Sequence, residues 1–165
     1  MSARLRPSRR LCFLLAALVV VADQLSKAWA TEHLADAGVR RFLPGLLELT
    51  YTTNTGAAFS LFSGAPRALG VVSLAVGLGV AVWIWRLGRG APLGLARCLA
   101  LGLLLGGAIG NGIDRWRLGA VVDFLAFVPI TFPVFNLADV AINLAVLCFL
   151  IDLLAPAAPG TGRGH

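Results

Sequence analysis

The sequence predicts an all-α polytopic membrane protein with four transmembrane helices and a small β-containing segment outside the membrane. Of its 165 residues, 58% are hydrophobic and 13% are charged. That charged share is about half the value usual for a soluble domain. The apolar residues form separate runs, each close to the ~20 residues that a helix needs to cross a bilayer. The predicted spans are residues 11–29, 68–85, 97–113 and 137–154.

Such runs predict helices, because a helix satisfies its own backbone hydrogen bonds within lipid. The length suits one unit, and we expect residues 1–165 to form a single membrane domain. The first run also resembles a cleaved secretory signal, since arginines precede it and "AWA" follows at 28–30. Asp23 and Lys27 would then precede the cut, and three further spans follow. We therefore expect the run to stay in the membrane.

The basic residues predict an orientation with both termini in the cytoplasm. Four arginines lie in the first ten residues, and the connection between the second and third spans adds Arg86, Arg89 and Arg97. Basic residues beside apolar runs favour the cytoplasmic side. Asp152 is then the one acid inside. The outer acids are Asp23, Glu32, Asp36, Glu48, Asp114, Asp123 and Asp139.

An outer segment at about 30–67 separates the first two spans. Its stretch "LLELTYTTNT" alternates and is rich in β-branched residues, which predicts a short strand. Its apolar neighbours indicate that the segment lies on the outer membrane surface and folds over the helix ends. Asn54 and Gly56 both suit a turn, and the Asn54 amide is equally suited to donate to a peptide backbone.

The third span carries Gly102, Gly106 and Gly110 at four-residue spacing. A stripe of small residues lets helices approach closely. We expect this packing to place Asn111 and Asp114 at the outer end of a tightly packed helix.

Composition argues against several other functions. The three cysteines, at 12, 98 and 148, lie inside apolar runs without CxxC spacing, so we expect small buried hydrophobes rather than disulfides or a thiolate metal site. The net charge is +6, but the basic residues are not interleaved with aromatic residues, which argues against nucleic acid as a partner.

Acidic residues gather at the predicted outer ends of the spans, where ionisable groups are costly unless they are paired or functional. Asp23 and Lys27 have the spacing of a helical ion pair. Such a pair suits the membrane interface by itself, and it would also orient a nearby site. Asn111 and Asp114 share a helix face, and Arg115 is suited to pair with a carboxylate or a lipid phosphate.

The start of the last span carries a polar stripe of Asn136, Asp139 and Asn143, which we expect to face the bundle. The helix dipole favours an acid such as Asp139 at this position. That effect does not explain why Asp114 and Asp123 lie at the same membrane interface.

Two carboxylates held close together cannot both ionise cheaply, so one keeps a proton and the pair can serve as general base and general acid around a water. This is the arrangement of an aspartic protease. His33 and His165 are the only histidines, and neither a Ser-His site nor a zinc site fits them. A Ser-Lys pair would need Lys27 with Ser26 or Ser60, and Mg²⁺ or Ca²⁺ on the aspartates stays open.

The chain resembles the bacterial lipoprotein signal peptidase family, also called signal peptidase II. The motifs "DQLSK", "NTGAAFS", "GNGIDR", "VVDF" and "FNLADVAI" occur in the family's order, over about residues 11–154. Each motif is modest alone, but the ordered set is specific. Val140 and Ala145 depart from the Ser and Gly frequent in the family, and the connection between Asp123 and Asp139 is short. We expect these departures to affect the fit of the substrate rather than the chemistry.

The resemblance implies an intramembrane aspartic endopeptidase of the bacterial inner membrane, with its active site at the outer face. It would remove signal peptides from prolipoproteins, cutting before the diacylglyceryl-modified cysteine, without a metal or other cofactor. A β-sheet cradle and a helix would cover the site, globomycin would block it, and a monomer suffices. The catalytic pair would be Asp123 and Asp139. Substrate-binding or supporting residues would be Asp23, Lys27, Asn54, Gly56, Asn111, Asp114, Arg115 and Asn136.

A different class of function also uses buried acids: a small membrane transporter or lipid-binding bundle with an ion site. A transporter predicts polar residues at mid-depth in several spans. Here the polar residues gather at the outer ends, and the second span has only Ser73. This distribution disfavours a conduction path.

Overall fold

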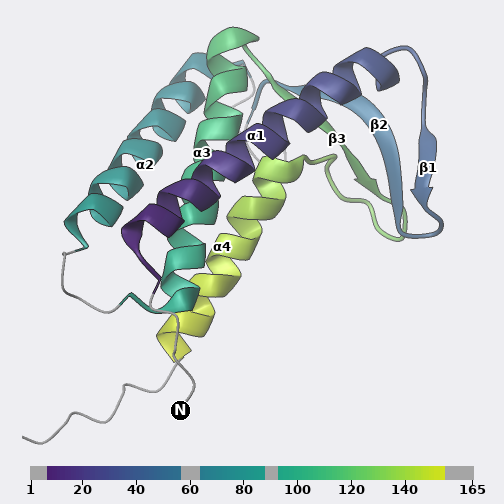
Figure 1. The fold of residues 1–165 in the computed structure, drawn as a ribbon. Helices are drawn as coiled ribbons and strands as arrows, with labels where there is room; N and C mark the ends of the chain where they lie inside the picture. The colour runs from purple at the N-terminus through teal and green to yellow at the C-terminus, as the bar shows by residue number, and fades with distance from the viewer. Residues whose placement is uncertain (1–6, 57–63, 88–92, 155–165) are drawn as a thin grey trace, which may run out of the picture.

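The computed structural model describes residues 7–56, 64–87 and 93–154. Four helices stand side by side, and a sheet extends from one end of them (Figure 1). In chain order the elements are α1 (Arg9–Leu34), β1 (Arg40–Leu43), β2 (Leu47–Asn54), α2 (Pro66–Arg86), α3 (Leu95–Arg117), β3 (Val121–Phe127) and α4 (Leu137–Leu154).

The four predicted spans are confirmed as helices that are long and apolar enough to cross a membrane. Helix α3 is the central one, since 61% of its most apolar window is buried, against 17–22% for the other helices. The outer helices turn large apolar side chains away from the protein, as at Leu18, Leu78 and Leu154. Such faces suit contact with lipid.

Small residues allow α3 to lie at the centre, as the glycine stripe predicted. A Cβ added at Gly102 would lie 2.8 Å from the carbonyl oxygen of Cys12, and one at Gly106 would lie 2.6 Å from the Cβ of Val19. On another face, a Cβ at Gly107 would lie 2.7 Å from the carbonyl oxygen of Ala138 in α4. These glycines let α1 and α4 approach the backbone of α3 directly.

The cysteines are free, and two of them pack as the small buried residues that were expected. Cys12 of α1 and Cys98 of α3 are fully buried, with 2.8 Å between their sulfur atoms. Cys148 of α4 is half-buried.

The sheet is antiparallel in the order β1-β2-β3. Strand β2 confirms the strand predicted around "LLELTYTTNT". The sheet is not confined to the segment between the first two helices, however, because β3 follows α3 and contributes Asp123. A short continuous apolar run such as "VVDFLAF" does not distinguish a buried strand from a helix by periodicity. The pattern therefore missed β3.

The covering helix that the family resemblance implied is not seen among the described residues of the outer segment. Residues 35–56 form turns and the first two strands, and α2 begins at Pro66. The apolar stretch "AAFSLFS" of that segment lies outside the described residues.

A single added methyl group tests the contact between α1 and α3. Gly106→Ala places its Cβ against Val19 and the carbonyl oxygen of Ala16, so we expect the helices to separate locally and stability to fall by about 1–3 kcal/mol. The measurement is thermal unfolding in detergent.

The matched control is Gly79→Ala in α2, where an added Cβ meets no atom within 4 Å. Alanine is the better helix former, so this variant should equal or exceed the parent in stability. Equal melting temperatures for Gly106→Ala and the parent would contradict the close packing.

Candidate active site

Buried polar side chains gather where α1, α3, β3 and the start of α4 meet. The turn after α3 brings β3 back beside that helix, and Gly119 in this turn has φ +72°. The residues that share this site and are at most 6% exposed are Asp23, Lys27, Asn111, Asp114, Asp123 and Asn136. The sequence predicted every one of them.

The Lys27 ammonium lies at the centre of this group. Its Nζ is 2.9 Å from Asp23 Oδ2, 2.9 Å from Asp114 Oδ2 and 2.9 Å from Asn111 Oδ1. An ammonium has three donors, so all of them are used. The predicted ion pair between Asp23 and Lys27 is confirmed, and it extends from α1 to α3.

The two acids that bind Lys27 also anchor other elements. Asp23 Oδ1 accepts a hydrogen bond from the backbone N–H of Ala138, at the start of α4 (3.0 Å). Asp114 Oδ2 accepts one from the backbone N–H of Val122 in β3 (3.2 Å). The ion-pair network therefore sets where β3 and α4 begin.

Gln24 belongs to the network and was not predicted. Its Nε2 donates to Asp114 Oδ1 at 2.9 Å and to the Gly110 carbonyl at 3.3 Å. Its place inside "DQLSK", next to Asp23, was the available signal. Sequence alone does not show which helix a glutamine beside Asp23 faces.

Asn111 links Lys27 to Asp139. Its Oδ1 accepts from the ammonium, and its Nδ2 donates to Asp139 Oδ1 at 2.8 Å. Because an ammonium can only donate, the amide oxygen must face Lys27, and the amide N–H₂ must then face the carboxylate. Lys27 thus orients a donor toward Asp139 without touching it.

Asn136 donates a hydrogen bond to Asp123 in a similar way, with 2.6 Å between its Nδ2 and Asp123 Oδ1. It also begins α4, because its Oδ1 accepts from the Asp139 backbone N–H (3.0 Å) while Asp139 Oδ2 accepts from the Asn136 backbone N–H (3.3 Å). This reciprocal pair has the form of a capping box. One helical turn therefore positions groups for both carboxylates.

Strand β3 brings Asp123 to the site. Asp123 pairs with Thr52 of β2, and Leu125 exchanges backbone hydrogen bonds with Phe135 (2.8 and 2.9 Å). The second contact returns the chain to β3 immediately before Asn136. Both carboxylates are thus held by regular structure or its immediate continuation.

The surroundings raise the pKa of Asp123 from 3.8 to about 7. Burial is the largest cause, because it disfavours the charged form, and the negative charge of Asp139 adds to it. Hydrogen bonds from Asn136 and Asn54 and the charge of Lys27 oppose the rise. At neutral pH, Asp123 is therefore close to its titration midpoint.

The four aspartates of the site fall into two pairs. Asp23 and Asp114 each form an ion pair with Lys27. Asp123 and Asp139 receive amide donors, and among the described residues neither carboxylate has a lysine or arginine nitrogen within 4.0 Å. The first pair is therefore held in ion pairs, whereas the carboxylates of the second pair are held by amide hydrogen bonds and are not paired with a cation in the described part of the chain.

Known proteins resemble this chain over most of its length. The family model described as "Signal peptidase (SPase) II" matches residues 15–155. The chain belongs to the signal peptidase II family. A "Lipoprotein signal peptidase" of Parasynechococcus marenigrum (strain WH8102) is 56% identical over 138 residues, covering 84% of this chain and 85% of that protein. One of Gloeobacter violaceus (strain ATCC 29082 / PCC 7421) is 45% identical, covering 90% and 89%.

Solved structures share the fold of this signal peptidase II family member. One, titled "Bacterial membrane enzyme structure by the in meso method at 2.3 A resolution", has a TM-score of 0.80 and 28% identity, covering 93% of each chain. A second, at 1.9 A resolution in its title, has a TM-score of 0.76 and 29% identity, covering 88% of this chain and 94% of that chain.

The remaining predicted site residues lie beside the carboxylates. Arg115 Nη2 donates to the Gly56 carbonyl at 3.2 Å, and its Nη1 donates to the Asn111 carbonyl at 3.4 Å. Asn54 Oδ1 accepts from the backbone N–H of Gly56 at 2.9 Å, so the predicted turn is confirmed. Arg115 therefore connects the end of β2 to α3.

Other expectations from the sequence differ from the structure. Asn143 does not face the bundle: it is exposed, and its Nδ2 donates to the Asp139 carbonyl at 2.9 Å. The Ser-Lys alternative finds no hydrogen bond between Ser26 and Lys27, because Ser26 donates to the Asp23 carbonyl and the Lys27 donors are all taken by other residues. Ser60 and His165 lie outside the described residues.

The raised pKa of Asp123 predicts a pH dependence of stability. Folding raises this pKa from 3.8 to about 7, so the folded protein binds the proton more tightly. Protonated Asp123 therefore contributes its full stabilisation of the fold below about pH 4. This stabilisation is lost as the pH rises from about 4 through about 7. Asp123→Asn, which stays neutral, should gain stability relative to the parent between pH 5 and pH 8.

Thermal unfolding in detergent across this pH range gives the measurement. Asp36→Asn, at an exposed carboxylate of the outer segment, is the control and should show no such trend. A difference between Asp123→Asn and the parent that stays constant with pH would contradict the assignment.

Proposed function

We propose that this family member is an aspartic endopeptidase that removes the signal peptide from diacylglyceryl-modified prolipoproteins. It would cut on the N-terminal side of the lipidated cysteine, with Asp123 and Asp139 as the catalytic pair. The observation that carries the proposal is the division of the four aspartates of the site. Two of them form ion pairs with Lys27, and the other two are joined through Asn136 and Asn111 by amide hydrogen bonds alone.

The chemistry needs one proton shared between the two carboxyls. We assign it to Asp123, because burial and the charge of Asp139 raise the pKa of Asp123 to about 7, so that a substantial share of this carboxyl is protonated near neutral pH. The ionised Asp139 takes a proton from a water, which attacks the scissile carbonyl. Protonated Asp123 stabilises the developing oxyanion, and a proton passes to the leaving amine as the C–N bond breaks. No acyl-enzyme forms, and the step requires no metal or other cofactor.

The supporting residues hold this pair in place. Lys27 orients Asn111, and Asn111 and Asn136 each direct a donor to one catalytic carboxylate. Asp23 and Asp114 hold the ammonium in place through two ion pairs. These roles are positional, since their contacts are with one another and with the catalytic pair.

The protein offers hydrogen-bond donors to a substrate backbone near Gly56. Arg115 Nε is buried and has no hydrogen-bond partner among the described residues. Arg115 also contacts the Gly56 carbonyl, and Asn54 lies in the adjacent turn. We assign these three residues to binding the extended peptide around the cleavage site.

Charge supports a placement in the bacterial inner membrane with the active site at the outer face. Arg9 and Arg10 begin α1, Arg86 ends α2, and Arg97 lies in the first turn of α3. All four lie at the end of the bundle opposite the four aspartates of the site. Basic residues favour the cytoplasm, so both termini would lie inside and the sheet outside. A monomer carries every proposed residue, and globomycin is the expected inhibitor. The alternative, a transporter or lipid-binding bundle, has no support from the relatives.

The catalytic assignment predicts that either amide substitution abolishes cleavage. Asp123→Asn and Asp139→Asn each remove one proton-transfer group, and we expect the rate to fall at least about 10³-fold. The measurement is cleavage of a purified, lipid-modified prolipoprotein in detergent, with folding checked by thermal unfolding.

Asp36→Asn is the matched control and should cleave at the parental rate. Globomycin should block the parent, and EDTA should leave its rate unchanged. An active Asp139→Asn enzyme would overturn the catalytic pair, and loss of activity with EDTA would favour a metal.

The proposed orientation predicts one-sided labelling of introduced cysteines. Asp36→Cys should react with a membrane-impermeant maleimide on intact spheroplasts, and Ser8→Cys should react only after permeabilisation. Both positions are exposed, while Cys12 and Cys98 are fully buried and contribute little background. The reverse pattern would invert the topology.

A further inference from the structure

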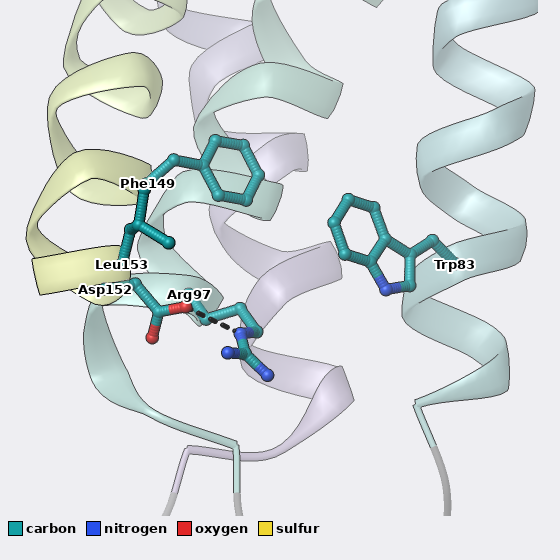
Figure 2. A pocket seen from close by; sticks show the side chains of 5 residues that line it. All are labelled: Trp83, Arg97, Phe149, Asp152 and Leu153. Carbon is teal, nitrogen blue, oxygen red and sulfur yellow. Dashed lines mark hydrogen bonds and ion pairs between the residues drawn. The ribbon is translucent and has the colours of Figure 1, made fainter. Parts of the chain in front are cut away.

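A pocket lies at the end of the bundle opposite the candidate active site. Its volume is about 600 Å³, and residues from three helices line it: Trp83 of α2, Arg97 of α3, and Phe149, Asp152 and Leu153 of α4. Figure 2 shows the indole of Trp83 on one side and Phe149 with the Arg97–Asp152 pair on the other. Nothing in the proposed proteolysis uses this pocket.

Two tryptophans place the pocket at the level of lipid headgroups. Trp83 and Trp85 lie in the last turn of α2, just before Arg86, and are 48% and 65% exposed. Tryptophan is enriched where a span meets the headgroup region, because its ring is apolar while its N–H is polar. The pocket therefore opens at the interface.

The walls of the pocket suit an acyl chain. The rings of Trp83 and Phe149 are stacked, with 6.0 Å between their centroids and 8° between their planes. Leu153 extends this apolar wall toward the end of α4 and is 78% exposed. An acyl chain that lies along these side chains would cover apolar surface that would otherwise stay open.

A cation lies at the mouth of this apolar pocket. Arg97 Nε is 2.8 Å from Asp152 Oδ2, and the Arg97 side chain is 46% exposed. Among the described residues, its two terminal nitrogens have no hydrogen-bond partner. A guanidinium with two free nitrogens matches the paired oxygens of a phosphate.

The local charge favours an anionic partner. Arg9, Arg10, Arg86 and Arg97 lie at this end of the helices, and among the described residues there Asp152 is the one acid. Basic pockets between spans at this membrane side are typical sites for anionic lipid headgroups.

We propose that the pocket binds an anionic phospholipid of the surrounding bilayer. Its phosphodiester would lie against the free nitrogens of Arg97, and one acyl chain would pack along Trp83 and Phe149. The site stands on its own residues and does not depend on the catalytic assignment.

Quenching of tryptophan by lipids with brominated acyl chains tests the proposal on the full chain. Replacing Trp29, Trp85 and Trp116 by Phe leaves Trp83 as the reporter. In phosphatidylcholine vesicles, brominated phosphatidylglycerol should half-quench Trp83 at a several-fold lower mole fraction than brominated phosphatidylcholine. The matched reporter keeps Trp85 instead, at the same level but outside the pocket lining, and should show no such preference.

Charge variants separate a phosphate contact from a structural ion pair. Arg97→Gln should abolish the preference for phosphatidylglycerol. Asp152→Asn should keep or increase it, because the guanidinium loses a competing carboxylate. Arg97→Lys should give an intermediate value, since lysine keeps the charge without the paired donors, and it serves as the test if Arg97→Gln does not fold.

Two results would overturn the site. Equal quenching of Trp83 by both lipids would mean that only unselective boundary lipid fills the pocket. Equal loss of the preference in Asp152→Asn and Arg97→Gln would mean that the ion pair shapes the pocket and that no phosphate contacts Arg97.

Discussion

The buried Lys27 ammonium is the interaction on which the rest of the site depends. It lies 2.9 Å from each of three acceptors, in Asp23, Asn111 and Asp114, and so joins α1 to α3. Removing one partner of a buried ion pair costs about 3–5 kcal/mol, because the remaining charge is left uncompensated. The same two aspartates hold the starts of β3 and α4 through backbone hydrogen bonds. Stability and site geometry therefore share one network.

This network also separates the acids that pair with Lys27 from the two that we propose to be catalytic. Because Lys27 has no donor left, the carboxylates of Asp123 and Asp139 receive amide hydrogen bonds instead. Amide donors position a carboxylate without cancelling its charge, so the negative charge of Asp139 still raises the pKa of Asp123. A protonated acid beside an ionised one is the state that water activation requires. The glycines of α3 contribute by letting the neighbouring helices approach closely enough to bury these groups.

Local rules predicted much of this protein. The lengths of the apolar runs located the four spans, and the alternating pattern located β2. Spacing along one helix predicted the pair of Asp23 and Lys27, and the ordered motifs predicted every residue of the buried polar group. Gln24, which is half-buried and bonds to that group, was not predicted. The run around Asp123 was ambiguous because apolar neighbours on both sides suit a strand or a helix. Asn143 was misplaced because a polar side chain on a stripe can bond to its own helix instead of facing the bundle.

The sequence by itself determined which residue types lie at each end of the spans, since apolar length, charge and helical spacing are local properties. Only the tertiary structure decided which acids pair with Lys27. Asp114 and Asn111 reach Lys27 from α3, a helix distant in the chain. Asp123 reaches Asn136 because Leu125 of β3 exchanges backbone hydrogen bonds with Phe135. The pKa of Asp123 is likewise a property of its surroundings, because desolvation and the field of Asp139 exist only in the folded chain.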